Sequence, residues 1–573
     1  MLPKLSLGVL ASCLLLFTTL GANAASKRPN IIFILTDDQD NHMNTLDHMP
    51  SLQKHLVHQG TTFERHYCTV AICCPSRVNL WTGKAAHNTN VTDVSPPWGG
   101  YPKFVEGGFN DNHLALWMQQ SGYNTYYSGK LFNSHTIYNY NDPPVRGYTG
   151  SNFFLDPFTY KYFNVSSTRD GQPPTNPVGK YSTDIVAEDA AEFLDRALQH
   201  PDAPFFLTLA PIAPHADSSP RGFTLPAVAP RHRGLFANYT ILRTDNFNPE
   251  TPSGVSWVAE LPRLNSTEID FNDEWQRRRL RALQAVDEII EDAVTRLAEA
   301  KVLDNTFIIY ASDNGYHISQ HRMHPGKTCG FETDINVPLI IRGPGVPKGH
   351  RTRVPSSHTD LAPTIMHIAG NRIDDRGFDG APIDLWGNRR YARSEHVAVE
   401  FWGPGRGEGP YGLRIEAEEY GFYYSVWCNN EKELYDMKRD PGQLNNLLSP
   451  KQNTAPPQLL PLGGRQIHLH QIANRLDALM MVLKSCKEKS CADPWGTLHP
   501  GGDVRSLRQA LSPRFDTFYR EQVKVSFTEC ELGYIVASEG PQGFNVFGRG
   551  WDGWGAEGMI EQRRLKATRE ERL

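Results

Sequence analysis

The sequence has few cysteines, no excess of positive charge, and no long apolar run beyond its first residues. Nine cysteines in 573 residues are too few for a fold held mainly by disulfides, although Cys486 and Cys491 are near enough to close one small loop. A formal net charge of -5 with interspersed signs argues against a nucleic-acid partner or a basic membrane patch. After the first 25 residues no stretch is long and apolar enough to cross a bilayer, so we expect no membrane span.

The first residues resemble a secretory signal peptide. Lys4 precedes an apolar run over residues 5–20, and Ala22-Asn23-Ala24 supplies the small residues that signal peptidase requires. We therefore expect residues 1–24 to be removed and the protein to be secreted, to the extracellular space or to a lysosome- or vacuole-like compartment. An N-terminal membrane anchor is the alternative, but the run is short for a span. Glycosylation sequons, which agree with a secretory route, occur at Asn90, Asn164, Asn238 and Asn265.

Short apolar runs alternate with helical patterns in the first two thirds of the chain. The runs have the composition of strands buried on both faces and cover residues 30–35, 205–209, 307–311 and 337–341. Between the second and third runs, apolar residues over 280–297 recur at three- and four-residue steps, which is typical of an amphipathic helix. This alternation predicts an α/β domain over residues 25–380, with a large, mostly parallel sheet flanked by helices.

The chain is longer than one hydrophobic core usually fills, so a smaller C-terminal domain is expected over residues 381–573. An aromatic run at 420–427 predicts a small antiparallel sheet and thus an α+β domain. Pro-Pro and Gly-Gly pairs indicate a linker at 449–464. The charged residues 557–573 predict a surface helix or a frayed tail.

Two groups of residues have the types that carry chemistry. Cys73-Cys74-Pro75-Ser76-Arg77 suits a helix start, because Pro75 fits a first turn, and a buried structural thiol or half of a disulfide would explain part of this pattern. Asp37-Asp38 and Asp313-Asn314 follow two of the predicted strands, where functional groups collect in parallel sheets. A solvated turn would explain Asp37-Asp38 alone, but together these oxygen donors suit calcium or magnesium.

The cysteine segment resembles the signature of the type I sulfatases, which belong to the alkaline phosphatase superfamily. The resemblance covers most of the mature chain and fades from about residue 450. It implies an alkaline phosphatase-like fold and oxidation of Cys73 to Cα-formylglycine by a formylglycine-generating enzyme. It also implies one calcium ion bound by Asp37, Asp38, Asp313 and Asn314, with the oxygen of the converted residue 73 near the ion.

The same resemblance implies roles for the basic residues. Arg77 would hold the hydrated aldehyde, and Lys130, after Gly122-Tyr123-Asn124-Thr125, corresponds to a sulfate-binding lysine. His215 in Ala213-Pro214-His215 corresponds to the histidine that assists the leaving group, and Lys327 corresponds to a second sulfate lysine.

One position departs from the family pattern. Many sulfatases have a histidine two residues after the first lysine, where this chain has Phe132. Either Asn133 or His135 could take that place, or the role could be absent.

Several further basic residues lie close to these motifs. His317, His321 and His324 could be taken for a zinc cluster, but a Gly-containing loop is a poor framework for one. His317 is predicted to line the active site and bind substrate, and His321 and His324 are predicted to be surface residues. Lys84 and His87 follow the cysteine motif and are either substrate contacts or a solvated helix end.

We therefore expect a secreted arylsulfatase that hydrolyses sulfate esters. In the implied chemistry, one hydroxyl of the hydrated aldehyde attacks sulfur, and the other then helps to expel sulfate. A sulfatase for sulfated sugars of the glucosamine-6-sulfate type is one alternative, and a phosphoester or phosphonate monoester hydrolase is another. An alternative of a different class is a non-catalytic, secreted glycan-binding protein in which Cys73 stays unconverted.

Overall fold

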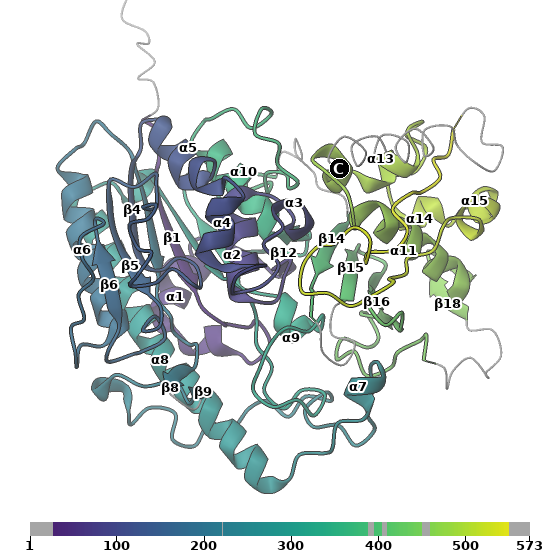
Figure 1. Ribbon diagram of the computed structural model, residues 1–573, viewed down its shortest axis with the longest axis horizontal. Helices are drawn as coiled ribbons and strands as arrows, with labels where there is room; N and C mark the ends of the chain where they lie inside the picture. The colour runs from purple at the N-terminus through teal and green to yellow at the C-terminus, as the bar shows by residue number, and fades with distance from the viewer. Residues whose placement is uncertain (1–26, 220–221, 388–394, 404–409, 450–458, 549–573) are drawn as a thin grey trace, which may run out of the picture.

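The computed structural model describes residues 27–219, 222–387, 395–403, 410–449 and 459–548. The predicted signal peptide and the charged segment 557–573 lie outside these ranges. Within them the chain forms a large α/β part, purple to green in Figure 1, and a smaller part that is green to yellow. Among the helices of the described ranges, none has both the length and the hydropathy that crossing a membrane requires.

The large part is built on a nine-stranded mixed sheet within the described residues. Parallel pairing connects the central strands from β10 to β5, and β11 and β6 run antiparallel to their inner neighbours. The strands, in spatial order, are β12 (His350–Thr352), β2 (Thr61–Phe63), β11 (Leu339–Arg342), β10 (Thr306–Ser312), β1 (Asn30–Thr36), β7 (Phe205–Ala210), β4 (Asn124–Lys130), β5 (Gly150–Leu155) and β6 (Ser166–Arg169). The predicted fold class is therefore confirmed, with a mixed rather than purely parallel sheet.

Strand β1 shows why these runs form the centre of the sheet. Its side chains alternate between two hydrophobic cores: Ile31, Phe33 and Leu35 pack on one face, and Ile32 and Ile34 on the other. All five are buried, and burying one aliphatic side chain of this size stabilises the fold by about 1.5–3 kcal/mol. A strand covered on both faces has no room for polar residues in its middle, so the polar residues of β1 are its first and last, Asn30 and Thr36.

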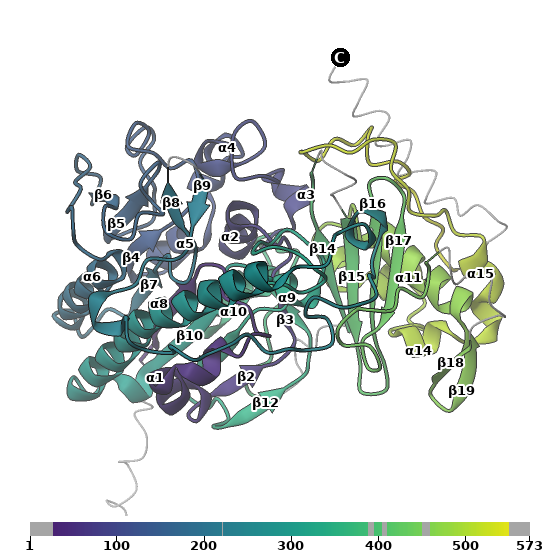
Figure 2. The same ribbon diagram turned by 90° about the horizontal axis from the view of Figure 1, so that it is seen from below.

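Helices cover both faces of the sheet (Figure 2). The core with Phe33 includes side chains of α2 (Cys73–Thr82), α5 (Leu114–Gln120) and α10 (Leu361–Ile368). The opposite core includes α6 (Ser182–Leu198) and α8 (Ser266–Glu299). Helix α8 begins with a capping box, in which Asn265 accepts from the Glu268 N–H and the Glu268 carboxylate accepts from the Asn265 N–H.

The smaller part contains the predicted antiparallel sheet. Strands β14 (His396–Glu400), β15 (Pro410–Glu416), β16 (Gly421–Trp427) and β17 (Lys432–Asp436) pair in sequence order, and α11 (Leu469–Leu483) packs against them. Its hydrophobic core also includes Val70 and Ala86, which precede and follow α2 in the sequence. The helix that begins with Cys73 is thus held by both parts of the molecule. The boundary near residue 380 stays a prediction.

The linker predicted at 449–464 is wrong for its second half. Strands β18 (Leu459–Leu462) and β19 (Arg465–His468) form an antiparallel hairpin. Gly463 and Gly464 form its turn with φ of 58° and 76°, a left-handed conformation that glycine adopts without steric cost. Residues 450–458 lie outside the described ranges.

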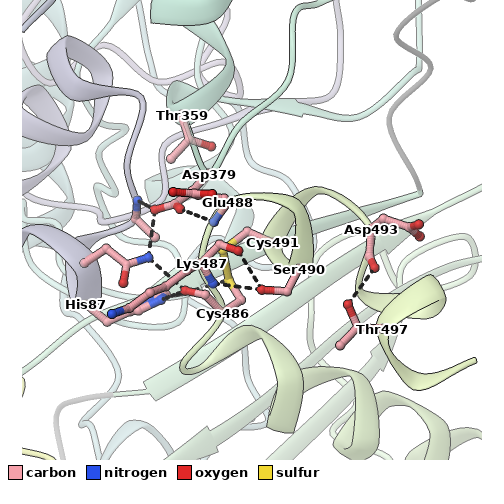
Figure 3. The surroundings of a disulfide bond; sticks show 12 residues. His87, Thr359, Asp379, Cys486, Lys487, Glu488, Ser490, Cys491, Asp493 and Thr497 are labelled. Atoms are coloured by element: carbon pink, nitrogen blue, oxygen red, sulfur yellow. Dashed lines mark hydrogen bonds between the residues drawn. A yellow bond between two sulfur atoms is a disulfide. The ribbon is translucent and has the colours of Figure 1, made fainter. Parts of the chain in front are cut away.

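Two disulfides lie in the smaller part. The Cys486–Cys491 bond closes the small loop that the sequence predicted (Figure 3). The bond between Cys428 and Cys530 joins residues 102 positions apart, a pairing that the sequence left open. The remaining cysteines of the described residues are buried and unbridged, and they are Cys68, Cys73, Cys74 and Cys329.

The four predicted glycosylation sites differ in exposure. Asn238 and Asn265 are exposed, and Asn90 and Asn164 are half-buried. A glycan needs an accessible amide nitrogen, so the first two are better placed for modification. Glycosylation of all four stays a prediction.

Candidate active site

Four oxygen-bearing side chains meet at one edge of the sheet. Strands β1 and β10 run parallel with Thr36 paired to Ser312, so Asp37-Asp38 and Asp313-Asn314 leave the sheet at the same level. The Asp38 N–H donates to the Asp313 carboxylate at 3.1 Å, and the Asn314 amide donates to the Asp38 carboxylate at 2.7 Å. All four side chains are buried.

Cys73 lies beside this group as the first residue of α2. Its sulfur is 3.5 Å from Oδ1 of Asp37 and 2.7 Å from Nζ of Lys327. One donor atom each from Asp37, Asp38, Cys73 and His215 lies within 4.8 Å of the others. Because helix α2 starts here, its unpaired backbone N–H groups and its dipole favour an anion near residue 73.

Three cations balance the three carboxylates: Arg77 and Lys130 are buried, and Lys327 is half-buried. Arg77 donates from Nε to Asp313 at 2.8 Å and from Nη1 to the carbonyl oxygen of Lys130 at 2.6 Å. Lys130 Nζ donates to Asp37 at 2.5 Å. Lys327 bonds to Asp38 and lies 3.4 Å from the side-chain oxygen of Asn314. The formal charges of this group cancel, which is how so many ionised side chains can be buried together.

The pKa shifts follow from burial and from these pairs. Burial alone would raise the pKa of Asp37, but the charges of Lys130, His215 and Arg77 lower it to about 2. Burial also opposes ionisation of Asp38, but Lys327 and His215 together outweigh it, so the pKa of Asp38 is lowered. For Cys73, burial and the Asp37 charge raise the pKa to about 11, so the thiol is protonated at neutral pH.

His215 and Tyr160 form an aromatic wall next to the ionic group. The His215 ring stacks on Tyr160 at 4.1 Å between centroids, its Nδ1 bonds to the carbonyl oxygen of Ala216 at 2.8 Å, and its Nε2 is 3.5 Å from Asp38. Phe223, on the short strand β9 (Gly222–Thr224), lies 5.0 Å from the His215 ring and is 59% exposed. The wall therefore continues from the buried site to the surface.

Tyr160 is the site residue that the sequence analysis missed. Its hydroxyl is 3.9 Å from the sulfur of Cys73, and its ring lies 4.6 Å from Nζ of Lys130. Asn133 donates to the Tyr160 hydroxyl at 2.7 Å, so Asn133 reaches the site through Tyr160. No motif marks Tyr160, and only its place in the fold brings it to residue 73.

Phe132 and His135, which lie near Asn133 in the sequence, pack in other surroundings. Phe132 packs on Phe104 at 4.6 Å between centroids, and His135 lies against Tyr101 at 4.4 Å. Burial lowers the pKa of His135 to about 4, and no contact of its ring with residue 73 occurs among the described residues. The possibility that His135 takes the place of the family histidine is therefore wrong in this structure.

The histidines after Asn314 separate into three environments. His317 is buried and bonds through Nδ1 to Asp334 at 2.8 Å, and its substrate contact stays a prediction. His321 was expected at the surface, but it is buried and stacked on Phe331 at 3.9 Å, which lowers its pKa to about 3. His324 is exposed, as predicted.

The predictions for His87 and Lys84, which follow α2, are also wrong. His87 is neither a substrate contact nor a solvated helix end: it is buried, pairs with Glu400, and bonds to the carbonyl oxygen of Cys486 at 2.7 Å (Figure 3). Lys84 is only part-buried, and its ammonium bonds to the carbonyl oxygen of Gly377. Both residues hold neighbouring segments together.

The donor set fits a hard divalent cation. Three carboxylates and one amide oxygen lie together in a buried site, and oxygen donors of this kind suit calcium or magnesium. At present Lys130 and Lys327 supply the positive charge that these carboxylates require. A cation bound between the carboxylates would release both ammonium groups toward an anionic ligand beside Cys73.

Comparison with known proteins adds three findings. The sulfatase family model matches residues 29–371. The chain is 35% identical to an arylsulfatase of Volvox carteri, over 91% of this chain and 84% of that protein, and 29% identical to human N-acetylglucosamine-6-sulfatase, over 87% and 91%. The structure of BT4656 with its substrate D-glucosamine-2-N,6-O-disulfate matches with a TM-score of 0.61 at 23% identity, covering 74% of this chain and 94% of that one, and supports the fold.

Proposed function

The chain belongs to the sulfatase family, and from that premise we propose that it is a sulfuric ester hydrolase that acts on aryl sulfates. The observation that carries this proposal is that donor atoms of Asp37, Asp38 and His215 lie within 4.8 Å of one another and of the Cys73 sulfur. Arg77, Lys130 and Lys327 form ion pairs with the carboxylates of this group. The similarity to an arylsulfatase extends over 91% of the chain, well beyond the catalytic motifs. We therefore propose aryl sulfates as the substrates on the basis of similarity along nearly the whole chain.

Two groups are proposed to complete the site. Formylglycine at position 73, made by a formylglycine-generating enzyme, would supply a hydrated aldehyde whose hydroxyl attacks sulfur. One calcium ion at Asp37, Asp38, Asp313 and Asn314, near the oxygen of residue 73, would activate that hydroxyl and screen the sulfate charge. The aldehyde is favoured over the thiol because a sulfated thiol could be freed only by a second attack on sulfur.

The basic side chains have distinct proposed tasks. Arg77, fixed by Asp313 and by the carbonyl oxygen of Lys130, has a rigid guanidinium beside residue 73 and orients the hydrate. Lys327, with Nζ 2.7 Å from the Cys73 sulfur, and Lys130, which pairs with the neighbouring Asp37, bind the sulfate oxygens. His215 faces the same space with Nε2, and its protonated form can give the Nε2 proton to the leaving oxygen, because Nδ1–H is already held by the carbonyl oxygen of Ala216. His317 is proposed as an additional substrate contact.

A sulfated sugar is the second candidate substrate. The similarity to human N-acetylglucosamine-6-sulfatase, over most of both chains, favours this alternative. The two classes differ at the leaving group, because a phenolate leaves readily as an anion whereas a sugar alkoxide needs a proton from His215 or Lys327. A mutation of His215 would thus slow sugar sulfates more than aryl sulfates.

The cellular route is also part of the proposal. Cleavage of residues 1–24 and glycosylation at Asn238 and Asn265, the exposed sequons, would accompany secretion to the extracellular space or to an acidic compartment. Relatives named as extracellular sulfatases support this route.

Side-by-side kinetics test the proposed reaction. The purified protein is assayed with 4-nitrophenyl sulfate, 4-nitrophenyl phosphate and N-acetylglucosamine-6-sulfate, and the Cys73→Ala variant is the control. We expect the highest kcat/KM for the aryl sulfate and no turnover by the variant. A higher kcat/KM for the phosphate would contradict the sulfatase proposal, and a higher value for the sugar would replace the aryl substrate class. Binding of sulfated glycans without turnover would indicate the non-catalytic alternative.

A further inference from the structure

Tyr160 is a buried side chain in the site to which the proposed reaction assigns no task. It is 8% exposed, and its ring is fixed on two sides, by stacking on His215 at 4.1 Å and by Nζ of Lys130 at 4.6 Å. These contacts leave the phenol little rotational freedom. Its hydroxyl points toward the side chain of residue 73, with 3.9 Å between oxygen and sulfur.

The hydrogen bond from Asn133 determines what the phenol can do. Asn133 donates from Nδ2 to the Tyr160 oxygen at 2.7 Å. A phenol has a single proton to donate, and one that already accepts from an amide is free to donate elsewhere. The acceptor that the Tyr160 hydroxyl faces is the atom attached to Cβ of residue 73.

A sulfur atom is a weak acceptor, and 3.9 Å is long for a strong interaction. A hydroxyl oxygen attached to the same Cβ would be a stronger hydrogen-bond acceptor than sulfur. The Asn133–Tyr160 pair is therefore arranged for an oxygen at residue 73. This observation is independent of the cation-binding carboxylates, which lie on the Asp37 side of the same residue.

We propose that Tyr160, held by Asn133, is a positioning residue that donates a hydrogen bond to one hydroxyl of the hydrated aldehyde at residue 73. The inference rests on the proposed function, since it requires that Cys73 is converted. No covalent bond is made or broken by Tyr160, and its proton stays on the phenol. The bond stabilises the hydrate relative to the free aldehyde and fixes which hydroxyl faces sulfur.

Two conservative variants test this role. Tyr160→Phe keeps the ring contacts with His215 and Lys130 and removes only the hydroxyl. Asn133→Asp replaces the donor by a carboxylate that only accepts, and so turns the Tyr160 proton away from residue 73. The matched control is Tyr181→Phe, since Tyr181 is also buried and donates to the carbonyl oxygen of Ala227 at 3.1 Å, outside the site.

The first measurement is the rate at which an aminooxy reagent labels the folded enzyme at residue 73. Only the free aldehyde reacts, so losing one hydrogen bond to the hydrate should raise the rate about three- to tenfold in both test variants. The kcat/KM for 4-nitrophenyl sulfate should fall by a similar factor. Tyr181→Phe should match the wild type, and peptide mass spectrometry should show equal conversion of Cys73 in all four proteins.

Contrary outcomes are readily distinguished. If Tyr160→Phe and Asn133→Asp label and turn over within twofold of the wild type, Tyr160 is only a wall of the site and the inference is wrong. If one variant fails to fold, the other still decides. If the wild type contains no aldehyde at residue 73, the proposed function fails as well.

Discussion

The buried pair of His87 and Glu400 predicts that stability falls as the pH rises from neutral to alkaline. The two side chains are 2% and 1% exposed, and they join α3 (Ala86–Thr89), just after α2, to the end of β14. Burial alone would lower the pKa of His87, but the Glu400 charge and hydrogen bond raise it from 6.5 to about 9. The folded protein therefore binds more protons than the unfolded chain between these two pH values.

The sign and size of the effect follow from this shift. The pair contributes fully below pH 6.5, and the contribution is lost as the pH rises through 9. At about 1.4 kcal/mol per pKa unit, the loss is about 3 kcal/mol. Replacing Glu400 by Gln removes the negative charge that holds His87 protonated, so the variant should be destabilised at pH 6 by about 3–5 kcal/mol and much less above pH 9.

Urea unfolding at half-unit pH steps from 6 to 10 measures this difference between wild type and Glu400→Gln. Taking the difference removes the titration of groups common to both proteins. Glu291→Gln is the control, because Glu291 pairs with His55 at the surface and is 43% exposed, so its effect should stay below about 1 kcal/mol. A wild-type minus Glu400→Gln difference that is constant from pH 6 to 10 would refute the reasoning.

Four further predictions concern the site and its support. Cys73→Ala should abolish turnover while circular dichroism and the thermal midpoint stay close to wild type, because the helix it begins is held at both flanks. Chelation of calcium should remove activity and lower the thermal midpoint by scanning fluorimetry, with both restored by added calcium, since the site carboxylates lose a counterion. Phe223→Ala should lower kcat/KM about three- to tenfold for aryl sulfates and less for a small alkyl sulfate, as an aromatic contact is lost; equal losses would contradict a ring contact. Replacing both Cys486 and Cys491 by Ser should cost about 2 kcal/mol in urea unfolding, because the bridged loop is short.

The strands and the long helix were predictable because burial leaves a periodic signature. The continuous apolar run of β1 and the three- and four-residue steps of α8 each reflect what their side chains pack against. Strand direction has no such signature, so the run that forms β11 did not reveal that it pairs antiparallel with β10. The hairpin at Gly463-Gly464 was misread as a linker, because glycine marks tight turns and flexible segments alike.

The site was predictable to the extent that its residues lie in motifs or at strand ends. Asp38 and Asp313 are placed by the register of two parallel strands, which the sequence pattern implies. Tyr160 comes from a loop without a motif, and its position depends on contacts with Lys130 and His215 that only the folded chain creates. His321 was misjudged because a histidine can stack on an aromatic ring and be buried without its charge.

The most direct test of the whole account is the mass of the peptide that contains residue 73, taken from active, purified enzyme. We expect the peptide to have lost one sulfur and two hydrogen atoms and gained one oxygen, and we expect the specific activity toward 4-nitrophenyl sulfate to scale with the converted fraction. A fully active protein in which residue 73 remains an unmodified cysteine would contradict it.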